Sequence, residues 1–564
     1  MRKKDILLKG IQNREETKRL TKWMLHVVKP YARFIVYTFI ISIVSMGISY
    51  MSTIVGKYVV DDATSGVINL KNMLWMCGTT LVSIVIGIFS SIISSYISEK
   101  FSFSLRKQFF NDIQRSSWLD ITKVHSGDLV TRLTSDIGSI SDGLINIIPK
   151  TILIVIQLLV AFFILFHYDK PIALFALILG PIGAACLVIF RGRYKKYQEE
   201  LRITESEYRS FMQESLSNLT VVKAFGQEEA NDQKMEGFKK KRLNLVFKNA
   251  RLSNIMGALM RIVYSAGYVI AFCWGSYRIS TGDITYGTLT IFITLVSQVQ
   301  GSISSLAGIV PQFYSMLISA KRITAVIDLP KEEYTGKSDV PAAVGLEARH
   351  VDFAYDTELI LKDVNFQVKA GEKIGIVGPS GVGKTTLIRM LLALTKPTGG
   401  ALEYSFADGG KEAACPDSRR FVSYVPQGNT LITGTIAENL QMGYREATAE
   451  EMHRALRLAA ADTFVEKQPE GVNTFLSEKS GGISEGQAQR IAIARALIAE
   501  KPILILDEAT SALDEHTETV ILKNITENLN DKTCFIITHR PSMLQYCERV
   551  LEIDESGSVR VREL

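Results

Sequence analysis

Apolar runs long enough to cross a lipid bilayer occupy the first half of this 564-residue chain and leave few folds open to it. Phe34–Val55 and Met73–Ile97 carry no charge, and each exceeds the ~20 residues with which a helix spans ~30 Å of hydrocarbon. Further apolar runs cover about Leu144–Phe166, Pro171–Phe190, Ser253–Tyr277 and a stretch that begins near Ile284. We therefore predict six transmembrane helices.

The long segments between the spans are predicted to extend the membrane helices well beyond the bilayer. Phe101–Trp118 and Arg193–Gln213 mix charged and apolar residues at helical spacing and contain no glycine or proline. The last run stays uncharged from Ile284 to Ala320, and as one helix it would be about 55 Å long. Pro311 is a possible kink within it.

Charge predicts the orientation of these spans. Segment 191–251 is densely basic, whereas the connections on the opposite side are short and nearly neutral. Because Lys and Arg accumulate on the cytoplasmic side, we predict a multi-pass protein of the plasma membrane with its N-terminus and second half in the cytoplasm. We expect no removable signal peptide, since no short apolar stretch with a cleavage site opens the chain. Six scattered cysteines without metal-binding spacing are expected to be reduced thiols.

Polar residues near the spans have two interpretations each. Lys150 and Arg261 lie toward the cytoplasmic ends of their runs, which favours snorkelling, and a substrate-facing role is the alternative. Gln157, Gln298 and Gln300 favour hydrogen bonds between helices, with a position along a transport pathway as the alternative. No intramembrane Asp, Glu or His indicates a proton relay, so a nucleotide is the more plausible energy source.

A nucleotide site is predicted in the second half. The sequence KIGIVGPSGVGKTT, Lys373–Thr386, passes from an apolar strand through a glycine-rich turn into an apolar helix. It fits the phosphate-loop pattern Gly-x-x-x-x-Gly-Lys-Thr, in which backbone N–H groups and a helix N-terminus cradle a di- or triphosphate. The predicted nucleotide-binding residues are Gly378, Pro379, Ser380, Gly381, Val382, Gly383, Lys384, Thr385 and Thr386.

Other motifs complete this site. In PILILDE an apolar strand ends in two carboxylates, of which Asp507 suits Mg²⁺ and Glu508 suits activation of a water. The Thr385 hydroxyl is a second predicted metal ligand. Ser484-x-x-Gln487 is a capping box whose helix N-terminus could also bind an anion. His539 ends an apolar strand, where we expect a contact with the γ-phosphate.

In combination, these motifs make the chain similar to ATP-binding cassette exporters of the half-transporter type. The resemblance implies that Tyr355 stacks on adenine, that Gln427 senses Mg²⁺ and acts in catalysis with Glu508 and His539, and that Ile483–Gln487 is the family signature. Its nucleotide-binding members would be Ser484, Gly486 and Gln487. The resemblance further implies a D-loop, Ser511–Asp514, a coupling-region glutamate, Glu478, and coupling helices near Trp118–Val124 and Glu214–Val221.

The signature departs from the usual family pattern. Ile483, Ser480 and Glu485 replace the usual Leu, Gly and Gly. A carboxylate beside a phosphate site repels ATP unless it turns away, and we expect that Glu485 points outward. Its effect on turnover stays open at this point.

The expected fold class is a membrane all-α domain, with six transmembrane helices and long cytoplasmic extensions, fused to an α/β phosphate-loop domain. The expected layout is a basic N-terminal segment at 1–30, a membrane domain at 31–320, a linker at 321–345 and a nucleotide-binding domain at 346–564. Because the chain has one phosphate loop and one signature, the resemblance implies a dimer that sandwiches ATP and Mg²⁺.

The expected function is ATP-driven export of a hydrophobic or amphipathic drug, lipid or peptide. Partners would be a second half-transporter, the bilayer and the substrate, with no nucleic acid. Half of a heterodimer, an importer on the exporter fold, and an ATP-gated channel or membrane regulator are the alternatives.

Overall fold

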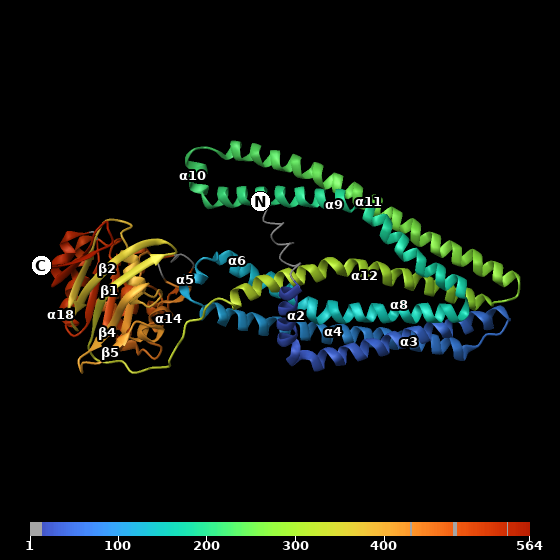
Figure 1. The fold of residues 1–564 in the computed structure, drawn as a ribbon, viewed down its shortest axis with the longest axis horizontal. Coiled ribbons are helices and arrows are strands. Elements are labelled where there is room, and N and C mark those ends of the chain that lie inside the picture. Colours follow the sequence, from blue (N-terminus) through green and yellow to red (C-terminus); the bar gives the residue numbers. More distant parts are fainter. Residues whose placement is uncertain (1–13, 429–430, 478–481, 539) are drawn as a thin grey trace. The chain divides into compact units, whose positions relative to one another are not determined.

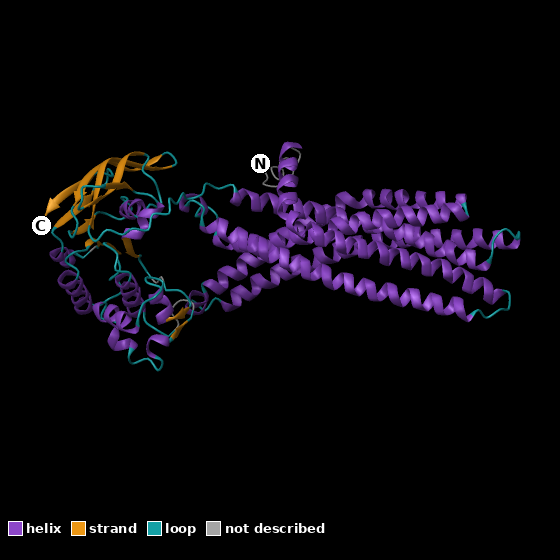
Figure 2. Cartoon of the chain, turned by 90° about the horizontal axis from the view of Figure 1, so that it is seen from below, coloured by secondary structure: helices purple, strands orange, loops and turns teal. Residues whose placement is uncertain are grey.

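The protein divides into two compact units in a computed structural model that describes residues 14–428, 431–477, 482–538 and 540–564 (Figure 1). At several positions between 180 and 191, and at 307, only the backbone is described. Unit 1 contains the chain up to Asp112 and His125–Asp328, and unit 2 contains Ile113–Val124 and Leu329–Leu564. Figure 2 shows that helices build unit 1, whereas the strands gather in unit 2.

The first half is built of helices, and several of them are longer than a bilayer requires. They are α2 (Arg14–Val28), η1 (Lys29–Tyr31), α3 (Ala32–Thr64), α4 (Leu70–Gln114), α5 (Trp118–Ile121), α6 (Ser126–Thr131), η2 (Arg132–Asp136), α7 (Ile137–Asp142), η3 (Gly143–Ile147), α8 (Ile148–Tyr168), α9 (Lys170–Ser217), α10 (Leu219–Ala224), α11 (Glu228–Ser280) and α12 (Tyr286–Ile327). The segments η2 and η3 are π-helical.

Within the described residues, five helical stretches are long and apolar enough to cross a membrane: Glu15–Thr64, Leu70–Gln114, Ser126–Tyr168, Glu228–Ser280 and Tyr286–Ile327. The remaining predicted span, Pro171–Phe190, lies in α9, where most side chains from 180 to 191 are outside the described residues. Helices α4 and α9 continue far beyond their apolar part, as predicted, although α4 ends at Gln114 and not at Trp118. Helix α11 also begins well before its apolar part. Helix α12 runs to Ile327 through Pro311, so residues 321–327, expected in the linker, are helical.

Small residues let the helices of unit 1 approach closely. Figure 1 shows α9 and α11 side by side, joined at one end by α10. A core of Ala161, Ala173, Ala176 and Ala271 packs with larger residues of α12, including the fully buried Phe292. At Gly275 of α11, an added Cβ would overlap Leu289 of α12. Such small-residue contacts are the usual way in which helices associate in a membrane, where water does not drive them together.

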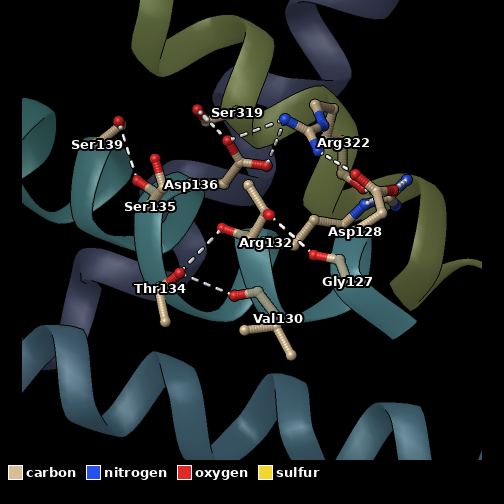
Figure 3. A network of polar contacts seen from close by, with 11 residues as sticks. Gly127, Asp128, Val130, Arg132, Thr134, Ser135, Asp136, Ser139, Ser319 and Arg322 are labelled. Atoms are coloured by element: carbon tan, nitrogen blue, oxygen red, sulfur yellow. Dashed lines mark hydrogen bonds and ion pairs between the residues drawn. The ribbon is translucent and has the colours of Figure 1, made fainter. Parts of the chain in front are cut away.

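A polar network ties the π-helical segment η2 to α12 (Figure 3). The Arg132 guanidinium donates to Asp128 at 2.7 Å and to the Arg322 carbonyl oxygen at 2.8 Å. The Arg322 side chain forms ion pairs with Asp128 and, at 3.2 Å, with Asp136. The Ser319 hydroxyl donates to the buried Asp136 carboxylate at 3.0 Å. Because a buried carboxylate is costly without partners, this network fixes the register of η2 against α12.

Unit 2 combines a parallel sheet with an antiparallel one. Its strands are β1 (Val344–Tyr355), β2 (Glu358–Val368), β3 (Lys373–Val377), β4 (Gly399–Phe406), β5 (Lys411–Ala413), β6 (Val422–Val425), β7 (Gly434–Thr435), β8 (Phe475–Leu476), β9 (Ile503–Asp507), β10 (Thr533–Ile537), β11 (Arg549–Ile553) and β12 (Val559–Glu563). The six-stranded order is β12-β11-β3-β10-β9-β6, parallel except for β12. Strands β2-β1-β4-β5 form the antiparallel sheet, and β7 pairs with β8.

Helices cover these sheets and complete two apolar cores. They are α13 (Lys384–Leu391), η4 (Pro416–Phe421), α14 (Ile436–Gln441), α15 (Ala449–Leu458), α16 (Asp462–Val465), η5 (Gly471–Asn473), α17 (Glu485–Ile498), α18 (Glu515–Asn528) and η7 (Pro541–Tyr546). One core joins α13 to β3 and the antiparallel sheet, and the other joins α14, α15 and α17 to β9. Strands β9 and β10 are buried along their whole length, which matches their continuous apolar sequence.

The polar network in unit 1 generates a stability prediction. Arg322→Ala leaves the buried Asp136 carboxylate without its cation, and breaking a buried pair costs on the order of 3 kcal/mol. We therefore expect a clear fall in the melting temperature of the detergent-solubilised protein. Arg19→Ala is the control, because the Arg19–Asp328 pair is exposed (68% and 47%) and such pairs contribute at most about 1 kcal/mol. Equal, small shifts in both variants would contradict the network's role.

Candidate nucleotide site

The predicted site residues follow the carboxyl ends of four parallel strands. Strand β3 pairs with β10, β10 pairs with β9, and β9 pairs with β6, so these ends meet at one edge of the sheet. The glycine-rich loop 378–383 follows β3, Gln427 follows β6, and Glu508 follows β9. His539 follows β10 but lies outside the described residues. Open α/β sheets bind ligands at this edge.

Glycines shape the loop after β3. Gly381 and Gly383 have φ of +87° and +111°, in the left-handed region that favours glycine, and Gly383 caps α13. A Cβ on Gly378 would lie 2.5 Å from the Ile553 carbonyl oxygen. Pro379, Ser380, Gly381 and Thr385 are exposed, Val382 and Gly378 are partly buried, and Thr386 is buried. The loop therefore presents backbone and the Thr385 hydroxyl to its surroundings at the N-terminus of α13.

Lys384 lies within this loop. Its ammonium group donates to the carbonyl oxygens of Gly378 at 2.6 Å and Pro379 at 3.2 Å. Burial lowers the pKa of Lys384 by disfavouring its charged form, although the carboxylates of Glu508 and Asp507 act in the opposite direction. A bound phosphate group would add further negative charge near this desolvated ammonium and so favour its charged form.

Asp507 and Glu508 occupy different environments. Asp507 is buried and accepts a hydrogen bond from the Tyr424 hydroxyl at 3.1 Å. Burial, together with the neighbouring Glu508 carboxylate, raises the pKa of Asp507 despite that bond and the charges of Lys384 and Arg389. A divalent cation beside Asp507 would favour the charged form of this buried carboxyl group.

Glu508 has an unusual backbone. Its φ of 47° places it in the left-handed region, which is uncommon for a residue with a side chain, and its N–H donates to the Ile537 carbonyl oxygen at 3.1 Å. The Gln427 amide donates to the Glu508 carboxylate at 2.7 Å. The structure thus brings two of the predicted catalytic residues together, on loops that follow β6 and β9.

Tyr355 ends β1 beside the loop helix α13. Its ring packs edge-on against Phe353 with the centroids 4.8 Å apart, and its hydroxyl accepts a hydrogen bond from Arg389 of α13 at 2.9 Å. The ring is partly exposed. An aromatic face held in place by two neighbours can stack on a nucleobase.

The predicted signature residues begin α17. Ser484 and Gln487 form the predicted reciprocal capping box, with the Ser484 hydroxyl accepting from the Gln487 N–H. Gly486 lies against the D-loop, because an added Cβ would be 2.9 Å from the Ala512 carbonyl oxygen. Glu485 is exposed in the first turn, where a carboxylate complements the helix dipole. Glu478 and Ser480 lie outside the described residues.

Three further residues emerge from the structure. Gln489 is almost fully buried, donates to the Ser511 hydroxyl at 3.2 Å and accepts from the Ala512 N–H at 3.1 Å, and so joins α17 to the D-loop. Tyr424 orients Asp507, and Arg389 holds Tyr355. A glutamine among apolar helix residues was a detectable signal for Gln489. The roles of Tyr424 and Arg389 depend on contacts distant in sequence.

These features define a nucleotide-binding unit joined to a unit of membrane-crossing helices, which is the architecture of an ATP-driven membrane transporter. Residues 34–303 match the family described as the ABC transporter transmembrane region, and residues 361–511 match the family described as ABC transporter.

Relatives that match along nearly the whole chain belong to the same kind of transporter. The chain is 30% identical to a Staphylococcus aureus protein described as a multidrug export ATP-binding/permease protein, over 96% of each chain. It is 28% identical to an ATP-dependent lipid A-core flippase of Desulfotalea psychrophila, also over 96% of each chain. Its fold matches a bacterial Atm1-family ABC exporter solved with ATP bound, at a TM-score of 0.79 and 22% identity, covering 94% of this chain and 96% of that one.

The chain belongs to the ABC transporter family. It binds ATP and is a multi-span membrane protein whose ATPase activity is coupled to transport. The predicted family resemblance and fold class are therefore confirmed, and the four-stranded antiparallel sheet adds to the expected parallel one.

The contact at Gly486 generates a prediction. Gly486→Ala places a methyl group against the Ala512 carbonyl oxygen, and overpacking of this kind typically costs ~1–3 kcal/mol. We expect a lower melting temperature and lower ATPase activity. Gly237→Ala in α11 is the matched control, because its added Cβ has open space and alanine favours a helix. Wild-type stability and ATPase activity of Gly486→Ala would show that the D-loop yields without cost.

Proposed function

We propose that this protein uses ATP to export a hydrophobic or amphipathic substrate, such as a drug, lipid or peptide, by alternating access in a dimer. The observation that carries this proposal is the convergence of the phosphate loop, Asp507 and the Gln427–Glu508 pair at one sheet edge of a chain that also has membrane-crossing helices. The relatives' names, which mention multidrug export and lipid A-core flipping, support this direction and substrate range.

The residues of the sheet edge suit ATP and Mg²⁺. Loop N–H groups and Lys384 would hold the phosphates, and the Tyr355 ring would stack on adenine. Thr385, Gln427 and Asp507 offer the oxygen ligands that Mg²⁺ prefers. When bound, Mg²⁺ would supply positive charge to the phosphate oxygens. The exposed Thr385 hydroxyl and the raised pKa of Asp507 are consistent with this set.

Glu508 is the proposed general base, and His539 the proposed γ-phosphate contact. The hydrogen bond from Gln427 holds the Glu508 carboxylate in place. There it would accept a proton from the attacking water, and such assistance is typically worth ~10²–10⁴-fold in rate. Ser484, Gly486 and Gln487 would contact the nucleotide held by a second chain, because a capped helix N-terminus is an anion site.

A polar cavity within unit 1 supports an amphipathic substrate. Two adjoining hollows, of about 440 and 310 Å³, lie among α3, α4 and α8 and are lined by many hydroxyl groups. Lys150 and Asn146 line one hollow, and Gln157 and Gln298 line the other. Gln300 instead is buried and packs against Gly267 of α11. Polar groups at membrane depth favour a substrate with a polar or charged part, and the position of Lys150 favours the substrate-facing interpretation over snorkelling alone.

The short helix α10 supports the dimer. Four apolar residues in and around it are well exposed within the described residues: Leu216 (70%), Leu219 (45%), Val221 (53%) and Phe225 (73%). Such a patch at the tip of a long helical pair is a surface for another protein. We propose that α10 docks on the nucleotide unit of a second chain, with the extensions and nucleotide units in the cytoplasm of a cell whose plasma membrane holds the dimer. ATP binding across two chains would then move the helices.

The alternatives differ in measurable ways. A heterodimer would require a second, different chain for activity. An importer would move substrate in the opposite direction in sealed vesicles, and an ATP-gated channel would dissipate a gradient without building one. The substrate class is tested by asking which drugs, lipids or peptides stimulate ATPase activity in lipid nanodiscs and accumulate in inside-out proteoliposomes.

Glu508→Gln tests the export proposal. The amide cannot accept the proton, so phosphate release and ATP-driven substrate accumulation should fall about 10²–10⁴-fold, while ATP binding is retained. Glu555→Gln, in an exposed turn before β12, is the control for the same chemical change. Normal phosphate release by Glu508→Gln would exclude Glu508 as the base.

Phe225→Asp tests the docking of α10. A charge on the apolar patch should reduce substrate-stimulated ATPase activity several-fold and leave equilibrium ATP binding intact, because the phosphate loop is untouched. Val561→Asp adds the same charge to an exposed apolar residue of β12 as a control. The particle mass of active nanodiscs should correspond to two chains. A fully active single chain would end the dimer proposal.

A further inference from the structure

The short helix α5 belongs to the nucleotide unit although it lies between two membrane helices in sequence. The Ser117 N–H donates to the Pro330 carbonyl oxygen at 2.8 Å, and the Glu332 N–H donates to the Arg115 carbonyl oxygen at 2.8 Å. Ser116 and Lys331 form an antiparallel bridge. Residues 115–117 therefore extend along the segment that enters the nucleotide unit, and they present Trp118 to it.

That segment is itself fixed to the nucleotide unit. Arg419 donates to both oxygens of Glu332, at 2.6 and 2.8 Å, and also to the carbonyl oxygens of Leu392 and Ala393 at the end of α13. Burial by itself would raise the pKa of Glu332, but hydrogen bonds from Arg419 and Tyr334 outweigh it and hold that pKa below its ordinary value. Segment 330–332, which holds α5, is thus fixed to the end of α13, the helix that begins at the phosphate loop. We call this position of α5 its seat.

Arg389 of α13 lies between α5 and the proposed adenine platform. Its guanidinium group stacks over the Trp118 ring, 4.7 Å from the ring centroid, and donates to the Tyr355 hydroxyl at 2.9 Å. Burial raises the pKa of Tyr424 and of Asp507, and the charge of Arg389 opposes both shifts. One side chain of α13 therefore contacts both α5 and Tyr355, and its charge reaches the carboxylate side of the site.

We propose that Arg389 is a positioning residue that couples the seating of α5 to the orientation of Tyr355. The inference rests on the proposed function, in which Tyr355 stacks on adenine. When Trp118 lies in its seat, the guanidinium plane is held on one face by the indole, and its edge restrains the Tyr355 hydroxyl. When α5 leaves, Arg389 regains rotamer freedom and Tyr355 loses its fixed partner.

The chemistry of arginine is essential to this arrangement. A guanidinium group is planar, so it stacks on an aromatic face and still donates hydrogen bonds in its own plane. A lysine ammonium has charge but no plane, and it could not make both contacts in this geometry. A second link joins the α5 region to the end of β1, the ion pair Lys123–Asp356 at 3.9 Å. Both side chains are exposed, so this pair contributes little. Coupling through Arg389 therefore dominates.

The test uses the full-length protein in nanodiscs and compares hydrolysis of ATP with hydrolysis of UTP, whose smaller base stacks less. Arg389→Ala, Trp118→Ala and Tyr355→Phe should each raise the KM for ATP about fivefold and change the KM for UTP much less, since each removes one member of the stacked, hydrogen-bonded set. The double variant W118A/R389A should be no worse than either single variant. Arg389→Lys should behave like Arg389→Ala.

Arg420→Ala is the matched control. Arg420 makes a similar contact, 4.0 Å from the Phe421 ring centroid, but its hydrogen bonds go to Asp339, Glu412 and Asp417 and not to Tyr355. This variant should keep the wild-type KM ratio for ATP and UTP.

The outcomes separate this inference from the proposed adenine site. If Tyr355→Ala retains the preference for ATP over UTP, the adenine site is wrong and the positioning role falls with it. If Tyr355→Ala loses the preference while Arg389→Ala and Trp118→Ala keep it, the positioning role alone is overturned. Additive effects in the double variant, or rescue by Arg389→Lys, would also overturn it.

Discussion

Parallel hydrogen bonding among β3, β10, β9 and β6 is the constraint on which the nucleotide site depends. Because parallel strands end at the same edge, segments far apart in sequence reach one place. The phosphate loop, Gln427 and the Asp507–Glu508 pair meet there without contributing to the sheet's apolar faces. The buried strands supply the rigidity, and the loops are free to carry polar groups. Lys384 and Asp507, both partly desolvated, then acquire opposite pKa shifts whose relief favours a bound phosphate and cation.

The membrane unit depends on a different balance. Water does not drive its helices together, so alanine and glycine contacts such as Gly275 against α12 provide close packing. Outside the apolar part, the same helices use charge, as in the Asp128–Arg132–Arg322–Asp136 network. One continuous helical backbone joins the part packed through small residues to the part held by charged contacts. A helix that keeps its hydrogen bonds across the boundary transmits a displacement at one end to the other.

Much of this architecture was predictable from local sequence pattern. Uncharged runs gave the helices, their mixed polar continuations gave the extensions, and the glycine-rich loop after an apolar strand marked the phosphate site. Features that depend on distant contacts were not predictable. The antiparallel sheet and the π-helical segments have no local signature, and the second short helix was expected at Glu214–Val221 but forms at Leu219–Ala224. The position of His539 stays a prediction. Trp118 was expected in a short helix, but its partner Arg389, 271 residues away, was not foreseeable.

The assignment of Ile113–Val124 to the nucleotide unit has a consequence for recombination between related transporters. A crossover placed only at the boundary near Leu329 would exchange the nucleotide-binding half but leave Ile113–Val124 from the original transporter. The new nucleotide unit would then have to bind a Trp118 side chain and pair with a backbone segment, 115–117, that come from a different protein. Functional chimaeras should therefore inherit two separate stretches of sequence together, and natural divergence should change them in concert.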